Sequence, residues 1–277
     1  METIGVIGLG IIGSVWARHY ASAGQLAGTW NRTPQPVAPA WKSTPSAVAA
    51  AADVIQIVVA DPAAVESILE QILPQLGPGK VVVQSSTIDA DSSVRFEQQV
   101  AARGARYLAA PFTGSKPAAE QRQTVYFLGG DPALIAQLEP LLSLVSSKRF
   151  VIGTNAQACT FKLAMNLNLA VQMQGLVEAL TMARTAGVTD AIFFEAMAQN
   201  AGYSGLVKLK EPKLRAGDFS PQFSVKHMLK DMRLASRLNG CADFLGLEAA
   251  REGLRKADAA GLADEDFSAV IKVAGQD

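Results

Sequence analysis

The chain has 277 residues, enough for one large domain or two ordinary ones, and 49% of them are hydrophobic against 18% charged. Its 25 basic and 25 acidic residues balance, which argues against nucleic acid as the main partner, because such a partner normally needs a basic excess. A small molecule is therefore the expected ligand.

The first half of the chain alternates short β-rich runs with segments of helical length. Near-continuous apolar runs such as 54–59 suit strands that are buried on both faces of a parallel sheet. Strands are predicted at 3–7, 26–30, 54–59, 81–84, 105–109, 125–128 and 150–152, and helices at 13–23, 63–73, 92–103 and 132–144. This alternation predicts right-handed crossovers and a doubly wound α/β sheet.

The pattern changes after about Thr154. The segment 156–186 is helical in composition, with Gly175 as its one internal glycine and no proline. Further helices are predicted at 191–200, 223–239 and 245–260, with Gly and Pro between them. We therefore expect a doubly wound α/β domain at 1–154, followed by an all-α domain at 155–277 that begins with one long helix.

A glycine-rich turn of the form GxGxxG lies between the first predicted strand and the first predicted helix. Its first glycine permits the tight turn, its second lets a pyrophosphate approach the backbone, and its third lets helix and strand pack closely. The helix start adds N–H groups and partial positive charge for phosphates. The alternative is a purely structural turn. We expect this turn to bind a nicotinamide dinucleotide through Gly8, Leu9, Gly10, Ile11, Ile12 and Gly13.

The end of the second predicted strand bears on the choice of cofactor. An NAD-selective site usually places a carboxylate there to hold the ribose 2′-hydroxyl, whereas this chain has Asn31, Arg32 and Thr33. No carboxylate would repel a 2′-phosphate, and Arg32 can pair with it through its planar guanidinium. Arg32 as an ordinary surface residue is the alternative. The segment predicts tighter binding of NADPH than of NADH.

Motifs along nearly the whole chain resemble a known family. They are GLGIIG at 8–13, NRTP at 31–34, SST at 85–87, PFTGSKPAAE at 111–120, FKLAMN at 161–166, FSVKHMLKD at 223–231 and DEDFSAVIK at 264–272. In this order they resemble the β-hydroxyacid dehydrogenases, above all the glyoxylate and succinic semialdehyde reductase branch beside the 3-hydroxyisobutyrate dehydrogenases. The resemblance implies a Rossmann domain, a helical second domain, and NAD(P)-linked oxidation of 3-hydroxyacids or reduction of small aldehyde acids.

The resemblance assigns a catalytic lysine to Lys162 and a substrate-orienting asparagine to Asn166. The two are four residues apart in a predicted helix, so their side chains share a face. A lysine in a partly desolvated cleft has its pKa lowered toward values useful for proton transfer, and as an ammonium it stabilises a developing alkoxide. Without the matched segment, Lys162 would be taken for a solvated helix lysine.

Further substrate and cofactor contacts follow from the same resemblance. It places Thr87 beside the nicotinamide, although Thr87 could instead be a cap near Asp89 and Asp91. A hydroxyl and consecutive backbone N–H groups could receive the substrate carboxylate at Thr113, Gly114 and Ser115.

The resemblance also assigns residues in the predicted helix at 223–239. Lys230 would reach the cofactor, and Phe223 and Asp231 would lie on the substrate side, unless Lys230 and Asp231 form only a surface salt bridge. His227, four residues before Asp231, is a rival acid that we interpret as a packing or surface residue.

Three positions depart from the family pattern. Ala109 replaces an Asp, Thr113 replaces a Ser, and Arg122 stands where relatives often have Gly. These changes reshape the carboxylate end of the expected pocket and leave the substrate open among several short aldehyde acids or hydroxyacids. The direction of the reaction is also open.

Two other functions compete with the dehydrogenase interpretation. Imine reductases share the fold and an Asn-Arg-Thr turn, but they usually show Asp or Tyr at the position of Lys162. A catalytically silent NADPH-binding protein is the other alternative, and Ala109 and Arg122 give it some support.

Location, metal content and assembly complete the expectations. The first strand follows Met-Glu-Thr without a basic leader, and polar residues interrupt the later apolar stretches, so we expect a cytoplasmic protein without a membrane span. Cys159 and Cys241 suggest no disulfide framework, and with only two histidines no close-spaced set of metal ligands is visible. The long helix and the alanine-rich helical half suggest buried helix–helix contacts, and the family resemblance implies a homodimer or homotetramer.

Overall fold

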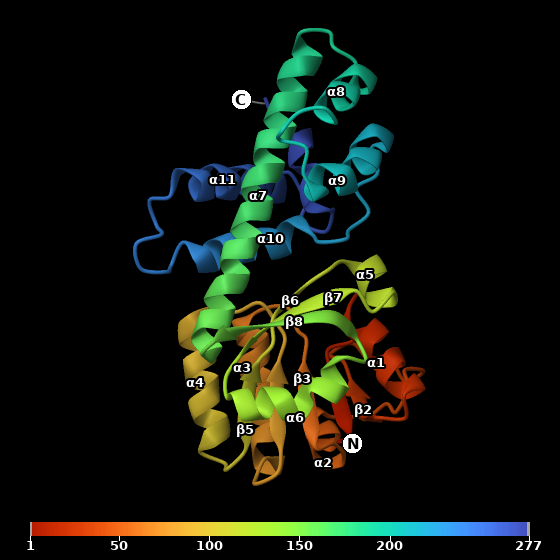
Figure 1. Cartoon of the computed structure of the whole chain (residues 1–277), viewed down its shortest axis with the longest axis vertical. Helices are drawn as coiled ribbons and strands as arrows, with labels where there is room; N and C mark the ends of the chain where they lie inside the picture. The colour runs from red at the N-terminus through yellow and green to blue at the C-terminus, as the bar shows by residue number, and fades with distance from the viewer. Residues whose placement is uncertain (1, 276–277) are drawn as a thin grey trace. The chain divides into compact units, whose positions relative to one another are not determined.

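The computed structural model describes residues 2–275 and divides the chain into two compact units, Met1–Lys162 and Leu163–Asp277 (Figure 1). The division falls inside a helix that begins at Asn155. The predicted fold class is confirmed: a largely parallel sheet with helices is followed by a helical unit.

The first unit is built on an eight-stranded sheet with the order β2-β1-β3-β4-β5-β7-β6, in which β8 also pairs with β7. Strands β1 to β5 pair in parallel. Strand β7 runs antiparallel to β5 and β6 and parallel to β8. The strands are β1 (Ile4–Ile7), β2 (Leu26–Trp30), β3 (Val54–Ile57), β4 (Val81–Gln84), β5 (Arg106–Ala109), β6 (Phe112–Thr113), β7 (Thr124–Gly129) and β8 (Ser146–Gly153).

Helices cover both faces of this sheet. Buried side chains of α1 and α6 pack on one face and those of α2, α3 and α4 on the other. Every residue of β1, β3 and β4 is buried, as expected for parallel strands covered on both sides. The helices are α1 (Gly13–Ser22), α2 (Pro45–Ala51), α3 (Pro62–Ile72), α4 (Ala90–Ala101), α5 (Lys116–Glu120) and α6 (Pro132–Leu142), with a 3₁₀ turn η1 (Leu73–Gln75).

Aspartate side chains begin three of these helices. Asp61, Asp89 and Asp131 each accept a hydrogen bond from a first-turn N–H of α3, α4 and α6 respectively. Such caps satisfy donors that have no partner inside the helix. Proline follows Asp61 and Asp131, and its fixed φ suits the first helical position.

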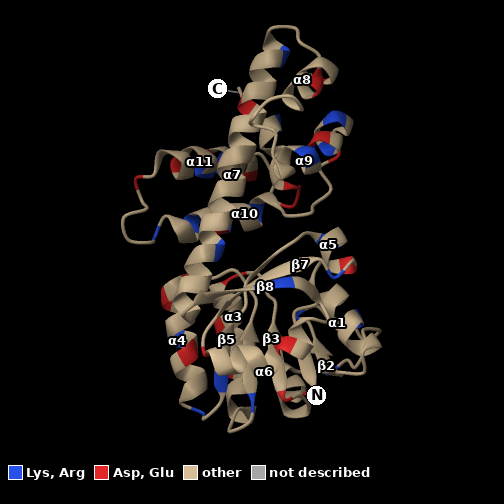
Figure 2. Cartoon of the chain, in the orientation of Figure 1, with Lys and Arg blue, Asp and Glu red and all other residues tan. Residues whose placement is uncertain are grey.

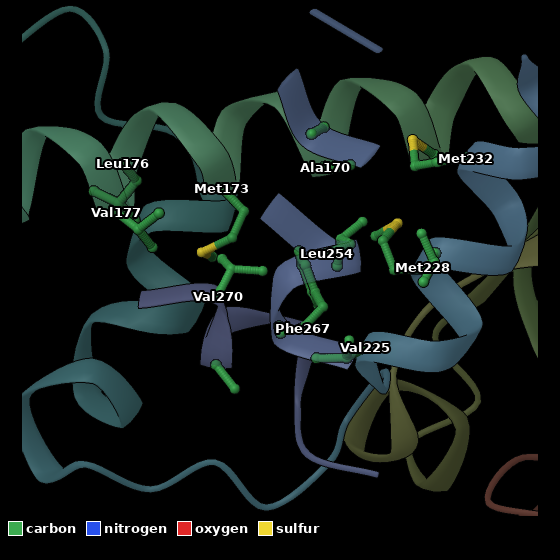
Figure 3. Packing of buried hydrophobic residues seen from close by; sticks show 14 of the residues in the cluster. Ala170, Met173, Leu176, Val177, Val225, Met228, Met232, Leu254, Phe267 and Val270 are labelled. Atoms are coloured by element: carbon green, nitrogen blue, oxygen red, sulfur yellow. The ribbon is translucent and has the colours of Figure 1, made fainter. Parts of the chain in front are cut away.

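The second unit is helical. Its elements are α7 (Asn155–Thr185), which begins in the first unit, α8 (Asp190–Met197), α9 (Gly205–Ala216), α10 (Val225–Ala235), α11 (Leu245–Ala259) and a 3₁₀ helix η2 (Phe267–Lys272). Figure 3 shows Met173 of α7, Met228 of α10, Leu254 of α11 and Phe267 of η2 pointing into one apolar core. Within residues 2–275, no helix combines the length and apolarity that crossing a bilayer requires.

A buried ion pair lies beside that core. The Lys210 ammonium of α9 is 2.7 and 2.9 Å from the two carboxylate oxygens of Asp266, and both side chains are almost fully buried. Asp266 also accepts hydrogen bonds from the N–H groups of Gln222 and Ser268. The pair therefore ties α9 and the segment before α10 to the start of η2.

Candidate active site

Several predicted site segments lie at the carboxyl edge of the parallel sheet. Strand β1 has β2 on one side and β3 on the other, so the chain reverses its direction of crossover there. In open α/β sheets, ligands bind outside the carboxyl ends of the strands at such a switch point. The glycine turn follows β1, Asn31–Thr33 follows β2, and Ser85–Thr87 follows β4, so all three segments leave the sheet at this edge.

Two glycines of the turn are required by close backbone approach. Gly8 has a φ of +103°, and a Cβ there would collide with the carbonyl oxygen of Val58. A Cβ on Gly13 would collide with the carbonyl oxygen of Gly8. Gly10 differs, because a Cβ there would meet no atom within 4 Å. Gly10 therefore leaves open space beside the backbone, as a bound pyrophosphate requires.

The start of α1 offers N–H groups at the same place. Ile12 is its N-cap and makes no side-chain capping bond. The first-turn bonds begin with the Ser14 N–H, which donates to the Gly10 carbonyl. Within residues 2–275, the N–H groups of Ile11 and Ile12 donate no hydrogen bond. With the partial positive charge of the helix start, these groups fit a dinucleotide phosphate.

The loop after β2 is held against this turn by Asn31. The Leu9 N–H donates to Asn31 Oδ1 over 3.0 Å, and Asn31 Nδ2 donates to the Thr33 carbonyl over 2.9 Å. Arg32 lies between these fixed residues, is exposed, and forms no ion pair within residues 2–275. Its guanidinium is therefore available to an external anion.

Two buried glutamines that the sequence interpretation did not single out organise the loop after β4. The Gln84 side chain accepts from the Ser86 N–H and donates to the Ser86 carbonyl, and Gln56 Nε2 donates to Ser85 Oγ. Ser86 Oγ in turn accepts the Val59 N–H. A polar residue inside an apolar strand run, as in VIQI and VVVQ, is the signal that could have identified them.

Thr87 follows these bonded serines and is half-buried. The N-cap of α4 is Asp89, whose carboxylate accepts the Ser92 N–H over 2.8 Å. A capping residue for α4 is thus already present next to Thr87.

The predicted carboxylate-binding segment forms the connection from β6 to α5. Thr113 ends β6 and is half-buried, and Gly114 adopts a φ of +127°. Ser115 is the N-cap of α5 but makes no side-chain capping bond. A hydroxyl at each end and an unusual backbone geometry between them suit recognition of a small anion.

In the helical unit, Asn166 and Asp231 are brought together although 65 positions separate them. Asn166 Nδ2 donates to Asp231 Oδ2 over 2.6 Å, and both residues are almost fully buried. Asp231 Oδ1 pairs with the ammonium of Lys230 at 2.7 Å. The salt bridge between Lys230 and Asp231, which was the alternative interpretation, therefore involves a buried carboxylate that also fixes the Asn166 amide.

Lys162 lies on α7 one helical turn before Asn166, and it is only 8% exposed. A nearly buried lysine is uncommon in proteins. Its burial separates it from the solvated helix lysine that was the alternative interpretation.

Phe223 and His227 stack on each other in the same unit. Their rings are nearly parallel with centroids 6.4 Å apart, and Phe223 also packs edge-on against Phe267. His227 Nδ1 shares a 2.8 Å hydrogen bond with Ser224 Oγ. These contacts agree with a packing role for His227.

The departures at Ala109 and Arg122 have local structural accounts. The Ala109 N–H donates to Asn155 Oδ1 over 2.7 Å, which joins the end of β5 to the start of α7. Arg122 adopts a φ of +58°, a conformation that explains why glycine suits this position. Its Nε donates to His19 Nδ1 over 3.3 Å, so the side chain contacts α1.

Charges of both signs are interspersed over each unit in Figure 2, without a face of one sign in that view. This distribution agrees with a small ligand more than with a polyanion. Within residues 2–275, no three His, Cys, Asp or Glu side chains are grouped as metal ligands.

Comparison with known families decides the class of the protein. Residues 3–153 match the NAD-binding domain of 6-phosphogluconate dehydrogenase, and residues 156–274 match the NAD-binding segment of NADP-dependent 3-hydroxyisobutyrate dehydrogenase. The chain belongs to the β-hydroxyacid dehydrogenase family. The resemblance inferred from the motifs is thereby confirmed. Members of this family are NAD(P)-dependent oxidoreductases that act on CH–OH groups, and this chain is one of them.

Individual family members resemble the chain along its length. Glyoxylate/succinic semialdehyde reductase 1 of Arabidopsis thaliana is 29% identical over 97% of both chains. The chloroplastic reductase 2 of the same plant is 31% identical over 98% of this chain and 78% of its own length. A crystal structure of 3-hydroxyisobutyrate dehydrogenase from Salmonella typhimurium superimposes with a TM-score of 0.88 at 26% identity, covering 99% of this chain and 100% of that one.

Proposed function

We propose that the protein is an NADPH-dependent reductase that converts a small aldehyde acid, of the glyoxylate or succinic semialdehyde type, into the corresponding hydroxyacid, or catalyses the reverse oxidation. The observation that supports this most directly is the nearly buried Lys162, one turn before an asparagine whose amide is fixed by Asp231. The two similar plant proteins are named for this pair of substrates.

NADPH rather than NADH is supported by the loop after β2. Arg32 is exposed and without an ion pair within residues 2–275, and no carboxylate occupies the segment from Asn31 to Thr33. The turn from Gly8 to Gly13 would hold the pyrophosphate, and Arg32 the 2′-phosphate. Thr87 and Lys230 complete the proposed cofactor contacts.

The bound cofactor would supply the hydride for reduction of the aldehyde. The protein supplies the proton: Lys162 Nζ–H donates it to the carbonyl oxygen, so the ammonium becomes an amine and the oxygen a hydroxyl. Before transfer, the ammonium stabilises the negative charge that develops on that oxygen. In the reverse direction the Lys162 amine accepts the hydroxyl proton.

Orientation of the substrate is assigned to polar side chains and backbone N–H groups. Asn166, held by Asp231, would donate a hydrogen bond to the reacting molecule. The carboxylate would be received by Thr113, Gly114 and Ser115, and Phe223 and Asp231 are assigned to the substrate side. Holding the carbonyl carbon in one orientation lowers the entropic cost of reaching the reactive geometry.

The substrate class is tested with a panel of short aldehyde acids and NADPH, followed by absorbance at 340 nm. We expect NADPH consumption with at least one member of the panel. Turnover of cyclic imines without turnover of aldehyde acids would replace the proposal with an imine reductase. No NADPH consumption with either class, together with NADPH binding, would favour the catalytically silent alternative.

The role of Lys162 is tested by Lys162→Ala. General acid catalysis contributes about 10²- to 10⁴-fold, so we expect kcat to fall by at least about 100-fold while the Kd for NADPH changes little. Lys208→Ala, at an exposed lysine of α9, is the matched control and should retain full activity. Circular dichroism checks that the variant folds. A folded Lys162→Ala enzyme with more than a few per cent of the wild-type rate would contradict the assignment.

A further inference from the structure

One residue of the glycine turn has both of its backbone polar groups bonded to side chains of the loop after β2. The Leu9 N–H donates to Asn31 Oδ1 over 3.0 Å, and the Leu9 carbonyl accepts from Gln35 Nε2 over 3.2 Å. Leu9 is only 5% exposed. Because a buried backbone group without a partner costs free energy, these two side chains specify where the turn lies against the loop.

The loop itself is fixed to the sheet on the far side of Gln35. The Ala38 N–H donates to the Gln35 carbonyl over 2.8 Å. Thr29 Oγ1 of β2 donates to the Pro39 carbonyl over 2.7 Å, and the Thr29 N–H donates to the Ala40 carbonyl. The backbone at Gln35 is thus held close to β2, and its side chain reaches the turn from a fixed base.

Arg32 lies inside this bonded circuit. Asn31 on one side is bonded to Leu9, Thr33 on the other is bonded to Asn31, and Gln35 closes the circuit back to Leu9. A shift of the turn therefore shifts the backbone that presents the Arg32 guanidinium. Conversely, an anion that displaces Arg32 would also displace the backbone of Leu9.

We propose that Gln35 is a positioning residue for the cofactor: it couples the pyrophosphate turn to the loop that presents Arg32, so that the two phosphate contacts form together. The part of this proposal that concerns the 2′-phosphate rests on the proposed NADPH specificity. Gln35 acts through the Leu9 carbonyl and not by touching the nucleotide. Its effect on binding should therefore depend on the presence of Arg32.

The first test measures hydrogen exchange in the protein without cofactor. Gln35→Met keeps the length of the side chain and removes its donor. We expect the Leu9 amide to exchange roughly tenfold faster in this variant, because the turn loses one of its two bonds to the loop. The Gly8 amide, which donates to the Trp30 carbonyl, should exchange at an unchanged rate and serves as the internal reference.

The second test measures binding of NADP⁺ and NAD⁺ by isothermal titration calorimetry. We expect Gln35→Met to weaken NADP⁺ roughly tenfold and NAD⁺ less, and we expect the loss to shrink in an Arg32→Ala background because coupled residues are not additive. Gln71→Met is the matched control, since Gln71 Nε2 also donates to a backbone carbonyl, that of Ser67, but on the exposed face of α3.

The outcomes separate this proposal from the proposed function. Unchanged Leu9 exchange in a folded Gln35→Met protein overturns the coupling by Gln35, whatever the enzyme does. Faster exchange with equal weakening of both nucleotides keeps the coupling to the turn and refutes the NADP-specific part. Fully additive losses in the double variant would show that Gln35 does not act through the Arg32 loop.

Discussion

Arg32 is exposed between two residues whose positions are fixed by hydrogen bonds, and this arrangement determines how its loss should act. Hydrogen bonds to a charged group contribute about 1.5–3 kcal/mol. We therefore expect Arg32→Ala to raise the Kd for NADPH by roughly 10- to 100-fold and to change the Kd for NADH little. The measurement is fluorescence titration with both nucleotides. Arg18→Ala, at an exposed arginine of α1, is the control. An unchanged preference for NADPH would contradict the assignment.

At the residue scale, the sequence predicts groups whose chemistry is visible in a local motif. The glycine turn and Arg32 belong to this class, whereas Lys162 is singled out only by the resemblance of its segment to the family. Gln35 could not be found in this way, because its meaning depends on a contact with Leu9 across 26 positions. Likewise, the hydrogen bond between Asn166 and Asp231 forms only when α7 and α10 pack together.

The ion pair between α9 and η2 gives a prediction at the scale of elements. Burial by itself would raise the pKa of Asp266, but the Lys210 ammonium and hydrogen bonds from Ser268 and Gln222 hold that pKa below its ordinary value. A carboxyl group with a lowered pKa in the folded state stabilises the fold above its unfolded pKa of about 3.9. That contribution is lost as the pH falls through the lowered pKa of the folded state.

Asp266→Asn should therefore change both the amount and the pH dependence of stability. Removing one partner of a buried pair costs about 3–5 kcal/mol, so we expect a loss of that order at pH 7. Below about pH 4 the difference in the free energy of unfolding between the variant and the wild type should decrease. Urea unfolding followed by circular dichroism between pH 3 and 7 measures both. Asp243→Asn, at an exposed aspartate, should leave the curve unchanged. A difference in the free energy of unfolding that stays constant across this pH range would contradict the link between protonation of Asp266 and stability.

Elements with one uninterrupted periodic signal are predicted well from the sequence. The strands at Leu26–Trp30 and Val81–Gln84 match their predicted bounds, because each is a short run of mostly apolar or β-branched residues between turn signals. Helix α9 was not predicted, since Pro212 inside it indicates a break that the surrounding packing overrides. The antiparallel direction of β7 was also missed, because strand direction is set by pairing and not by local pattern.

At the scale of the whole molecule, we expect a homo-oligomer. The helical unit leaves several large apolar side chains exposed, among them Met182 at 75% and Leu245 at 88%. We expect a second copy of the chain to cover some of these side chains, because exposed apolar surface is reduced when subunits associate. Light scattering coupled to size exclusion should give a mass that is a multiple of the chain's own. A monomer at micromolar concentration would contradict this expectation.

The position of the boundary between the two compact units is a feature of the whole molecule that the sequence does not mark. A change of composition near Thr154 marks the start of α7, whereas the structure divides its compact units at Lys162. Nothing in the periodicity of a continuous helix marks the residue at which its packing partners change. The family and the fold could nevertheless be predicted from the sequence, because motifs in the family's order run along nearly the whole chain.

The circuit of Leu9, Asn31 and Gln35 has a consequence for redesign. Bonds within the protein itself fix the backbone on either side of Arg32, so its side chain can be exchanged without rebuilding the turn. Replacing Arg32 with an acidic residue should then change the proposed coenzyme preference without altering Lys162, the proposed proton donor. A library restricted to this single codon would be small enough to screen completely for conversion to an NADH-driven biocatalyst.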